Sequence, residues 1–230
     1  MKSILKFGAV ILTLLCSYNA LAQRRGGDGK HNMFGFKAAA TVFNIKTSNF
    51  NTSAQSGFIG GLGTRGDFYN NWDIQFGINI SNSKLKVEAK KFAIAAPLEE
   101  IEYSLLNAQV HLLFGYKIFG NNKNLDSKFK LTAELGPVLM INNKMKISDK
   151  DKENYIIQEA LITAKELTNV TPLNINGLIG LSMGLERIRV FGHYQYGFNN
   201  FLNRLNDIEG TTEKFKGHVH MYNFGVLLYF

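Results

Sequence analysis

The sequence predicts an all-β protein, namely an eight-stranded, antiparallel, up-and-down transmembrane β-barrel. The last segment, Lys216 to Phe230, alternates along its length, with Tyr222, Phe224, Val226 and Leu228 on its apolar face. The chain contains 22 glycines but only three prolines, a composition that suits long and closely packed strands. After the amino-terminal segment no run of about 18 apolar residues follows, which excludes helical membrane spans and is typical of a transmembrane barrel.

Residues 1–22 are predicted to be a secretory signal peptide. Two lysines are followed by an apolar stretch from Phe7 to Cys16 and by Ala20-Leu21-Ala22, whose small residues suit cleavage. We therefore expect the mature chain to start at Gln23.

The mature chain is then divided into a short periplasmic leader, residues 23–32, and a barrel domain, residues 33–230. The alternative is a lipoprotein anchored through Cys16, the only cysteine of the chain. Leu15 precedes it where lipoprotein processing requires a small residue, so the signal-peptide interpretation is preferred. The mature protein is expected to carry neither a lipid anchor nor a disulfide.

Eight alternating segments make up the predicted barrel: residues 33–43, 57–69, 72–81, 103–119, 129–141, 173–185, 189–199 and 216–230. The third is the clearest, because large apolar residues from Trp72 to Ile80 alternate with polar or small ones. Long connections, predicted to face the outside, cover 44–56, 82–102, 143–171 and 200–215. The shorter connections, predicted to face the periplasm, are 70–71, 120–128 and 187–188.

Aromatic residues lie beside the short turns and the chain ends, and they predict an interfacial girdle: Phe34, Phe68, Trp72, Tyr116, Phe129 and Phe230. A soluble barrel with its apolar residues turned inward is the alternative. It explains the aromatic strand ends less well than surrounding lipid does.

Charged and polar side chains are predicted to share the inward faces of the strands: Lys37, Arg65, Asp67, Asp73, His111, Glu134, Glu186 and Arg189. The lumen of an eight-stranded barrel is filled by side chains, and an unpaired charge there would be costly. We therefore expect a structural network of mutually paired groups. A narrow ion path along the same residues is the alternative.

Ser182 and His193 are candidates for a hydrolase site. Pairing the sixth and seventh strands through Glu186 and Arg189 places these two side chains opposite each other inside the barrel. Both would lie in a packed lumen without a substrate entrance, so a structural hydrogen bond is favoured. We predict no catalytic residues and no enzymatic activity.

Two further motifs are predicted to bind neither a cofactor nor a metal. Gly61-Leu62-Gly63-Thr64-Arg65-Gly66 has the spacing of a dinucleotide-binding loop, but it lies within a strand and no helix follows to receive a pyrophosphate. Inward-facing glycines instead make room for large neighbours. His218 and His220 share the face of Tyr222 without an evident third ligand, so they are interpreted as residues of the outer rim.

The connection at residues 148–170 combines charged and apolar residues. Apolar residues from Tyr155 to Leu167 recur at roughly helical spacing, which predicts a short amphipathic helix. This helix would be either a lid resting on the rim or a contact surface for a partner.

The formal net charge is +8, yet the charges of the predicted outer loops nearly cancel. A nucleic-acid surface requires a concentrated basic patch, and none is visible in the sequence. We therefore predict no nucleic-acid partner.

Several short motifs indicate a family: the signal peptide, the opening Phe34-Gly35-Phe36-Lys37-Ala38-Ala39, the glycine-rich second strand, the Glu134-Leu135-Gly136-Pro137 step and the terminal Tyr229-Phe230. With these motifs the chain resembles the PorT-like family of outer-membrane β-barrel proteins, as a small barrel of the OmpX or OmpA type. The resemblance covers essentially the whole mature chain and implies a location in the cell outer membrane. In such barrels the assembly machinery recognises the final strand, so the resemblance makes Phe230 part of the expected assembly signal.

These inferences predict a non-enzymatic outer-membrane protein whose outer loops bind a partner or stabilise the envelope. The expected contacts are outer-membrane lipid, the outer-membrane assembly machinery and an envelope or secretion protein. Part of the PorT-like family is linked to protein secretion, and an accessory role there is one form of this prediction. The alternatives are a lipid- or acyl-modifying outer-membrane enzyme and a narrow channel.

Overall fold

The computed structural model describes residues 32–230 apart from 70, 92–96, 121–128, 158–159 and 209–213, and it describes the backbone but not the side chains of 68 and 69. The predicted signal peptide, residues 23–31 of the predicted leader and most of the predicted turn 120–128 lie outside the described residues. No helix among the residues described is long and apolar enough to cross a membrane.

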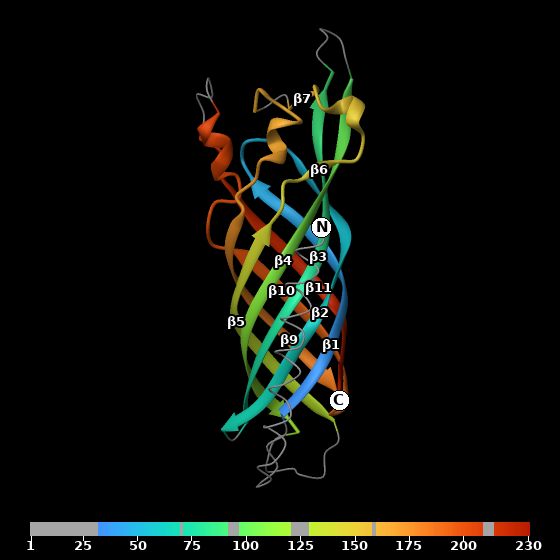
Figure 1. Ribbon diagram of the computed structural model, residues 1–230, viewed down its shortest axis with the longest axis vertical. Coiled ribbons are helices and arrows are strands. Elements are labelled where there is room, and N and C mark those ends of the chain that lie inside the picture. Colours follow the sequence, from blue (N-terminus) through green and yellow to red (C-terminus); the bar gives the residue numbers. More distant parts are fainter. Residues whose placement is uncertain (1–31, 70, 92–96, 121–128, 158–159, 209–213) are drawn as a thin grey trace, which may run out of the picture. The chain divides into compact units, whose positions relative to one another are not determined.

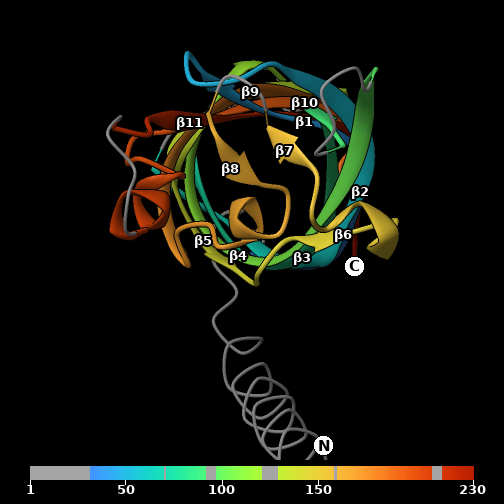
Figure 2. The same cartoon turned by 90° about the horizontal axis from the view of Figure 1, so that it is seen from above.

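Eight long strands form one closed ring (Figures 1 and 2). Their bounds are Asn32–Thr47 (β1), Thr52–Tyr69 (β2), Trp72–Lys90 (β3), Leu98–Phe119 (β4), Lys130–Asn142 (β5), Leu173–Gly184 (β9), Ile188–Gly197 (β10) and Gly217–Tyr229 (β11). Each strand pairs antiparallel with the next one in the ring. The last strand, β11, returns to β1 and closes the barrel. The predicted fold class and up-and-down order are confirmed.

The long connections contain only short elements within the described residues. These are β6 (Lys146–Ile147), η1 (Lys150–Lys152), β7 (Ile156–Ile157), β8 (Ile162–Thr163), η2 (Glu166–Thr168) and η3 (Asn203–Asp207). The prediction of an amphipathic helix over residues 148–170 is therefore wrong.

Local chemistry explains why an α-helix does not form there. The side chain of Asp149 accepts a hydrogen bond from the backbone N–H of Asp151 at 3.1 Å, which favours the single 3₁₀ turn of η1. Leu161 has a φ of 52°, a left-handed conformation that interrupts a right-handed helix. The apolar residues of this connection reach the barrel interior from a segment that folds back on itself, so they do not form one helical stripe.

The first four strands are longer than predicted. β3 and β4 have 19 and 22 residues, whereas a strand needs about 9–11 residues to cross a bilayer. Their pairing continues to Lys90 and Leu98, so most of the predicted loop 82–102 is strand. The predicted loop 44–56 is likewise reduced to residues 48–51. In Figure 1 the β3–β4 hairpin rises beyond the other strands at the end opposite the carboxy terminus.

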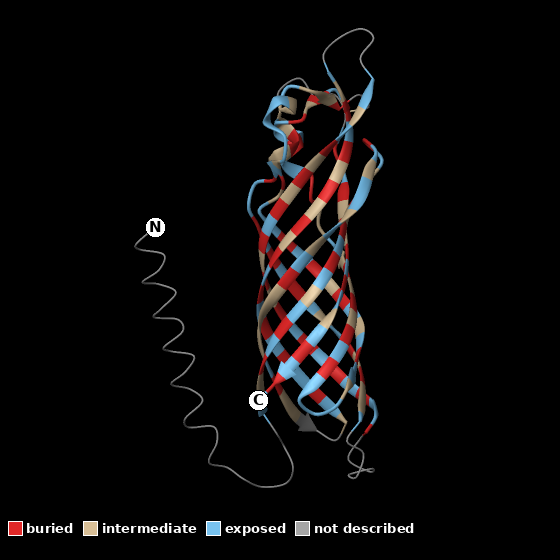
Figure 3. Cartoon of the chain, turned by 90° about the vertical axis from the view of Figure 1, so that its right-hand side faces the viewer, coloured by how far each residue is buried: buried red, intermediate tan, exposed pale blue. Residues whose placement is uncertain are grey.

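Inward and outward side chains also alternate in these extensions, but here the apolar side chains face inward and the charged side chains face outward. In the lower part of β3 the exposed residues, from Trp72 to Ile80, are apolar. In the upper part Leu85, Val87 and Ala89 are buried (0, 1 and 0 % exposed), and three lysines and Glu88 take the outward positions. Apolar side chains are stable outside where lipid surrounds the barrel, and inside where water surrounds it. Figure 3 shows buried and exposed residues alternating along the strands.

The interior of the barrel therefore has two layers. The layer near the short turns is polar and is described below. The other layer, which we call the outer core, is a hydrophobic cluster under the long connections. Its members from the ring are Phe43, Ile45, Leu85, Val87, Ala89, Ile101, Tyr103, Leu105, Met140, Val219 and Met221. Its members from the connections are Phe50, Met145, Ile157, Ile162, Ala164, Leu167, Val170, Phe201, Leu202, Leu205 and Phe215.

An aromatic girdle surrounds the end of the barrel that carries the short turns. Its ring pairs are Trp72–Tyr116, Phe34–Phe230, Phe36–Phe230 and Phe119–Phe129, with centroids 5.1, 5.5, 5.4 and 6.3 Å apart. The prediction of a girdle is confirmed for the described residues of the predicted set: Phe34, Trp72, Tyr116, Phe129 and Phe230. Phe36 and Phe119 also belong to it but were not predicted, and the side chain of Phe68 lies outside the described part of the chain. Such rings belong at a membrane interface, where one edge is apolar and the other is hydrated.

We predict that Leu85→Ala destabilises the folded barrel by about 2–5 kcal/mol, because it opens a cavity in the outer core. Lys84→Ala, one residue away on the outward face, should change the free energy of unfolding by less than about 1 kcal/mol. Urea unfolding of the detergent-refolded protein measures both values. Equal and small effects would mean that residues 82–90 behave as a loop.

We also predict that deletion of Phe230 reduces assembly in cells more than it reduces the stability of the folded barrel. Phe224→Ala is the matched control, because Phe224 and Phe230 are similarly exposed to lipid (60 and 64 %) but only Phe230 is terminal. Membrane yield in cells is compared with refolding yield in detergent. A deletion that lowers both yields to the same extent as the control would limit Phe230 to a packing role.

Candidate functional site

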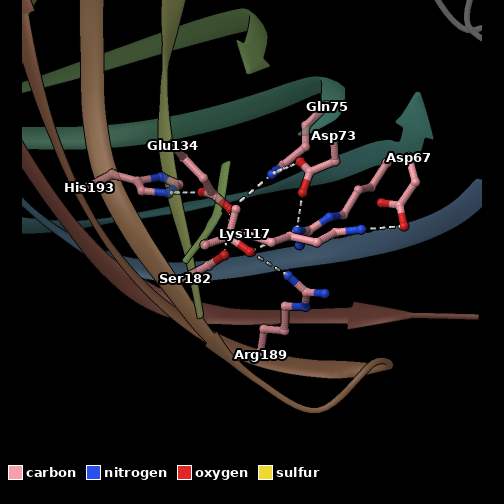
Figure 4. A network of polar contacts seen from close by, with 10 residues as sticks. Asp67, Asp73, Gln75, Lys117, Glu134, Ser182, Arg189 and His193 are labelled. Atoms are coloured by element: carbon pink, nitrogen blue, oxygen red, sulfur yellow. Dashed lines mark hydrogen bonds and ion pairs between the residues drawn. The ribbon is translucent and has the colours of Figure 1, made fainter. Parts of the chain in front are cut away.

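Glu134 on β5 is the centre of the polar layer. Gln75 Nε2 on β3 donates a hydrogen bond to Glu134 Oε1 at 2.8 Å, and Ser182 Oγ on β9 donates to the same oxygen at 2.5 Å. His193 Nε2 on β10 lies 2.7 Å from the other oxygen, Glu134 Oε2. Side chains from three other strands thus converge on one carboxylate that is 1 % exposed (Figure 4).

A second group of residues extends this network toward the short turns. Arg65 forms an ion pair with Asp73, and its Nη2 donates to Thr132 Oγ1 at 3.0 Å. Arg189 Nη1 donates to the same hydroxyl at 3.3 Å. Gln75 Nε2 also donates to Asp73 Oδ1 at 3.1 Å, which joins the two groups into one network. Buried charges need such partners, because each loses its hydration on folding.

The predicted lumen residues are mostly where the sequence places them. Buried and inward-facing are Lys37, Arg65, Asp73, His111, Glu134 and Arg189. Lys37 Nζ lies 4.5 Å from the centre of the Phe191 ring, a cation–π contact. His111 Nδ1 lies 3.1 Å from Asn79 Nδ2. Lys117, which was not predicted to belong to the polar layer, pairs with Asp67 and is 2 % exposed.

The inward placement of Glu186 is wrong. β9 ends at Gly184, whose φ of +145° turns the chain, and Glu186 is exposed in the tight turn that follows. Leu185 N–H donates to Ile188 O at 2.8 Å and closes this turn. Strict alternation from Ser182 would have pointed Glu186 inward, but the alternation applies only while the strand continues.

The register of β9 and β10 also differs from the predicted one. Ser182 lies opposite Phe191, and His193 lies opposite Gly180, so Ser182 and His193 are not a cross-strand pair. Both side chains contact Glu134 instead of each other. A serine nucleophile requires a base that accepts its proton, and here the hydroxyl donates to a carboxylate inside a packed layer. Ser182 and His193 are 0 and 3 % exposed, so this arrangement fits a structural hydrogen-bond network.

The glycine-rich motif of β2 has a packing role. A Cβ atom at Gly61 would lie 2.2 Å from Ile78 O on the neighbouring strand, which no side chain tolerates. The strand continues to Tyr69 without a helix behind the motif, as expected. A phosphate-binding loop is therefore not formed by these residues.

His218 and His220 lie on the outer face of β11, as predicted. His220 Nδ1 is 2.7 Å from the hydroxyl of Tyr194, and His218 Nδ1 is 2.9 Å from Gly197 O. Among the residues that the structure describes, no group of three or more potential metal-ligating side chains is found.

The connection between β5 and β9 closes the barrel mouth. Ile157, Ile162 and Leu167 are 1, 2 and 0 % exposed because they insert into the outer core, and Figure 2 shows β7 and β8 crossing the ring. The hydroxyl of Tyr103 donates to Ala164 O at 3.1 Å, and burial raises the pKa of this hydroxyl. Of the two predicted roles for this connection, a lid matches the observed geometry.

The rim is also tied to the lid by charged groups. Lys152 Nζ lies 2.6 Å from Glu99 Oε2 of β4, and Ser148 Oγ donates to Glu102 Oε1 at 3.1 Å. The hydrogen bond from Lys84, followed by that from Ser148, lowers the pKa of Glu102. These contacts were not predicted, because residues 82–102 were assigned to a loop.

Sequence comparison identifies the family of this closed barrel. Residues 31–203 match the family model described as outer membrane protein beta-barrel domain. The chain belongs to this family. It is therefore an outer-membrane protein, in agreement with the predicted location. A comparison with curated protein sequences gave no match.

Solved structures similar to this chain include the following three. The neisserial surface protein NspA is 13 % identical with a TM-score of 0.49, over 88 % of this chain and 100 % of its own. OprG from Pseudomonas aeruginosa is 17 % identical with a TM-score of 0.49, over 87 % and 97 % of the two chains. PagL, described as an outer-membrane enzyme, is 12 % identical with a TM-score of 0.40, over 84 % and 98 %.

We predict that Glu134→Ala lowers the free energy of unfolding by about 3–5 kcal/mol, because it leaves the buried donors Gln75, Ser182 and His193 without their shared acceptor. Glu186→Ala is the matched control and should have little effect, since Glu186 is exposed in a turn. Urea unfolding in detergent micelles measures the difference. Similar stabilities of the two variants would contradict a network centred on Glu134.

Proposed function

We propose that the protein is a non-enzymatic outer-membrane barrel whose extracellular end binds a protein partner or stabilises the envelope. One observation carries this proposal: both layers of the interior are filled, by the polar network and by the outer core with its lid. Little of the interior is then left for transport or catalysis. The surface that remains available is the outer rim and the β3–β4 hairpin.

The filled interior favours this proposal over a channel. An eight-stranded barrel has room for side chains but not for a continuous water column. Three charged side chains of the polar layer are almost fully buried: Glu134, Arg65 and Arg189 are 1, 2 and 1 % exposed. They are linked through shared hydrogen-bond partners, so they are unsuited to conducting ions. The lid adds a second, apolar barrier above them.

The position of Ser182 and His193 favours the proposal over a lipid-modifying enzyme. Their shared partner is the carboxylate of Glu134, and none of the three side chains is more than 3 % exposed. A lipid substrate would have to reach Ser182 through the wall of the barrel. Histidine and serine in this arrangement supply hydrogen bonds to a buried charge.

The β3–β4 hairpin is the candidate contact surface. Its outward face carries an ion-pair ladder, with Lys84 and Glu102 2.9 Å apart and Lys86 and Glu100 2.6 Å apart. Exposed ion pairs contribute little to stability, so the charged outward face of this hairpin is better explained by recognition than by folding. The resemblance to PorT-like proteins makes a secretion protein one such partner, and an accessory role in secretion is the finer form of this proposal.

We predict that the charges of this hairpin select the partner. Glu100→Lys removes the ion pair between Lys86 and Glu100. The double variant Lys86→Glu with Glu100→Lys keeps an ion pair at this position but exchanges the two charges. Both variants should lose a partner that is captured by mild crosslinking of intact cells expressing the native protein. Only the single variant should be slightly destabilised. Capture that is unchanged in both variants would remove the hairpin from the proposal.

We predict that the purified protein conducts almost no current in a planar bilayer. We also expect Ser182→Ala to leave the lipid composition of the outer membrane unchanged, as measured by mass spectrometry. Steady single-channel steps would favour the channel, and a lipid modification that disappears in the Ser182 variant would favour the enzyme.

A further inference from the structure

The outer surface of β10 and β11 carries an aromatic band at the upper limit of its apolar zone. Tyr194 and Tyr222 have ring centroids 4.9 Å apart, and Tyr196 stacks on His218 at 5.6 Å. Below this band the outward residues of β11 are apolar, from Phe224 to Leu228, and Phe230 follows the strand. Tyrosines mark the level of lipid headgroups, so this band lies at the outer interface of the membrane.

Basic side chains lie directly above the aromatic band. Lys46 on β1 is the cross-strand partner of His218 on β11, and Asn44 is the partner of His220. A lysine opposite a histidine is unfavourable whenever the histidine is protonated, because like charges then face each other. Lys46 forms no ion pair within the part of the chain that the structure describes. This pairing is stabilised if an anion lies between the two side chains.

A groove of about 570 Å³ runs past these basic groups on the outside of the barrel. Its lining includes Asn44, Lys46, His220, Tyr194 and Tyr222, and it contains no aspartate or glutamate among the described residues. The carboxylate of Glu88, which is not part of this lining, accepts a hydrogen bond from the lining residue Asn51 at 3.2 Å. The groove is thus complementary to a negatively charged group.

A second groove, of about 550 Å³, continues from the first toward the membrane. The two share Tyr194 and Tyr222, and the second is lined largely by apolar side chains such as Ile179, Leu181 and Phe224. Gly192 leaves the space open, since a Cβ atom there would already lie 3.3 Å from the ring of Phe224. A basic groove at headgroup level therefore leads into an apolar groove at the level of acyl chains.

We propose that these two grooves bind one phosphate-bearing lipid of the outer leaflet, with its phosphate near Lys46 and His220 and an acyl chain along Gly192. The two halves of the site match the two halves of such a lipid in polarity and in depth. Ordinary bilayer contact needs only an apolar surface, whereas this site combines the ammonium group of Lys46 and the imidazole of His220 with a continuous apolar groove. The inference is independent of the function proposed for the β3–β4 hairpin.

The test compares two probes that differ only in phosphate, dioleoylphosphatidic acid and dioleoylglycerol. Native mass spectrometry of the full chain in nonionic detergent measures how much of each is retained. The native protein should retain the phosphatidic acid preferentially. Lys46→Gln should weaken that retention about fivefold, the usual effect of one lysine at a membrane surface. His220→Gln should weaken it less, through the loss of a hydrogen-bonding side chain. Lys144→Gln, on the rim outside both grooves, is the control and should have no effect.

Gly192→Val tests the apolar half separately. It should lower retention of both probes without changing the preference for phosphate, because it fills the acyl groove. Heat-dependent migration in gels verifies that each variant is folded. The three substitutions lie at different positions, so if one variant misfolds the other two still test the proposed lipid site. Equal retention of both probes by the native protein would overturn the inference, as would unchanged retention in all three variants. Displacement of the lipid by millimolar inorganic phosphate would also overturn it, in favour of a free anion.

Discussion

The structure depends on one constraint, which is that the solvent outside the barrel changes from lipid to water partway along the strands. A strand turns alternate residues inward and outward, so each level of the barrel divides its side chains into two sets. In the membrane the apolar set faces lipid and the polar set fills the lumen. Beyond the membrane the same strands turn lysines and glutamates outward and leucine, valine and isoleucine inward. The two-layered interior follows from this inversion.

Each layer is closed by a different interaction. The polar layer relies on charge-assisted hydrogen bonds, with Glu134 receiving donors from three other strands. The outer core relies on hydrophobic burial, to which the β5–β9 and β10–β11 connections contribute Leu167, Phe201 and Leu205. Because the lid residues are part of this core, the connections are held in place by the same free energy that stabilises the strand extensions. This arrangement leaves the outer rim, the hairpin ladder and the lipid-facing grooves as surfaces for binding.

The sequence allowed the fold class, the strand order and most lumen residues to be predicted, because lipid on one side produces a regular alternation. The strand extensions were missed for a specific reason. Residues do alternate in this segment, with Leu85, Val87 and Ala89 placed between Lys84 and its charged neighbours. The prediction assumed that apolar residues of a strand face outward to lipid, so it did not recognise a strand whose apolar residues face inward. Glu186 and the Ser182–His193 pairing were placed wrongly because the register depends on where the turn begins, and Gly184 ends β9 earlier than alternation indicates. The prediction of a helix at 148–170 was wrong because the spacing of apolar residues cannot distinguish the apolar face of a helix from a loop whose apolar residues fold into a core.

Single-cysteine labelling along β3 tests the inversion most directly. Cys16, the only native cysteine, lies in the predicted signal peptide, so cysteines introduced one at a time at Ser81 to Lys90 can be labelled selectively. A membrane-impermeant maleimide is applied to intact cells. The two-layered barrel predicts rapid labelling at Lys84, Lys86 and Glu88 and protection at Leu85, Val87 and Ala89. Uniform labelling across these six positions would contradict it and would indicate a solvated loop.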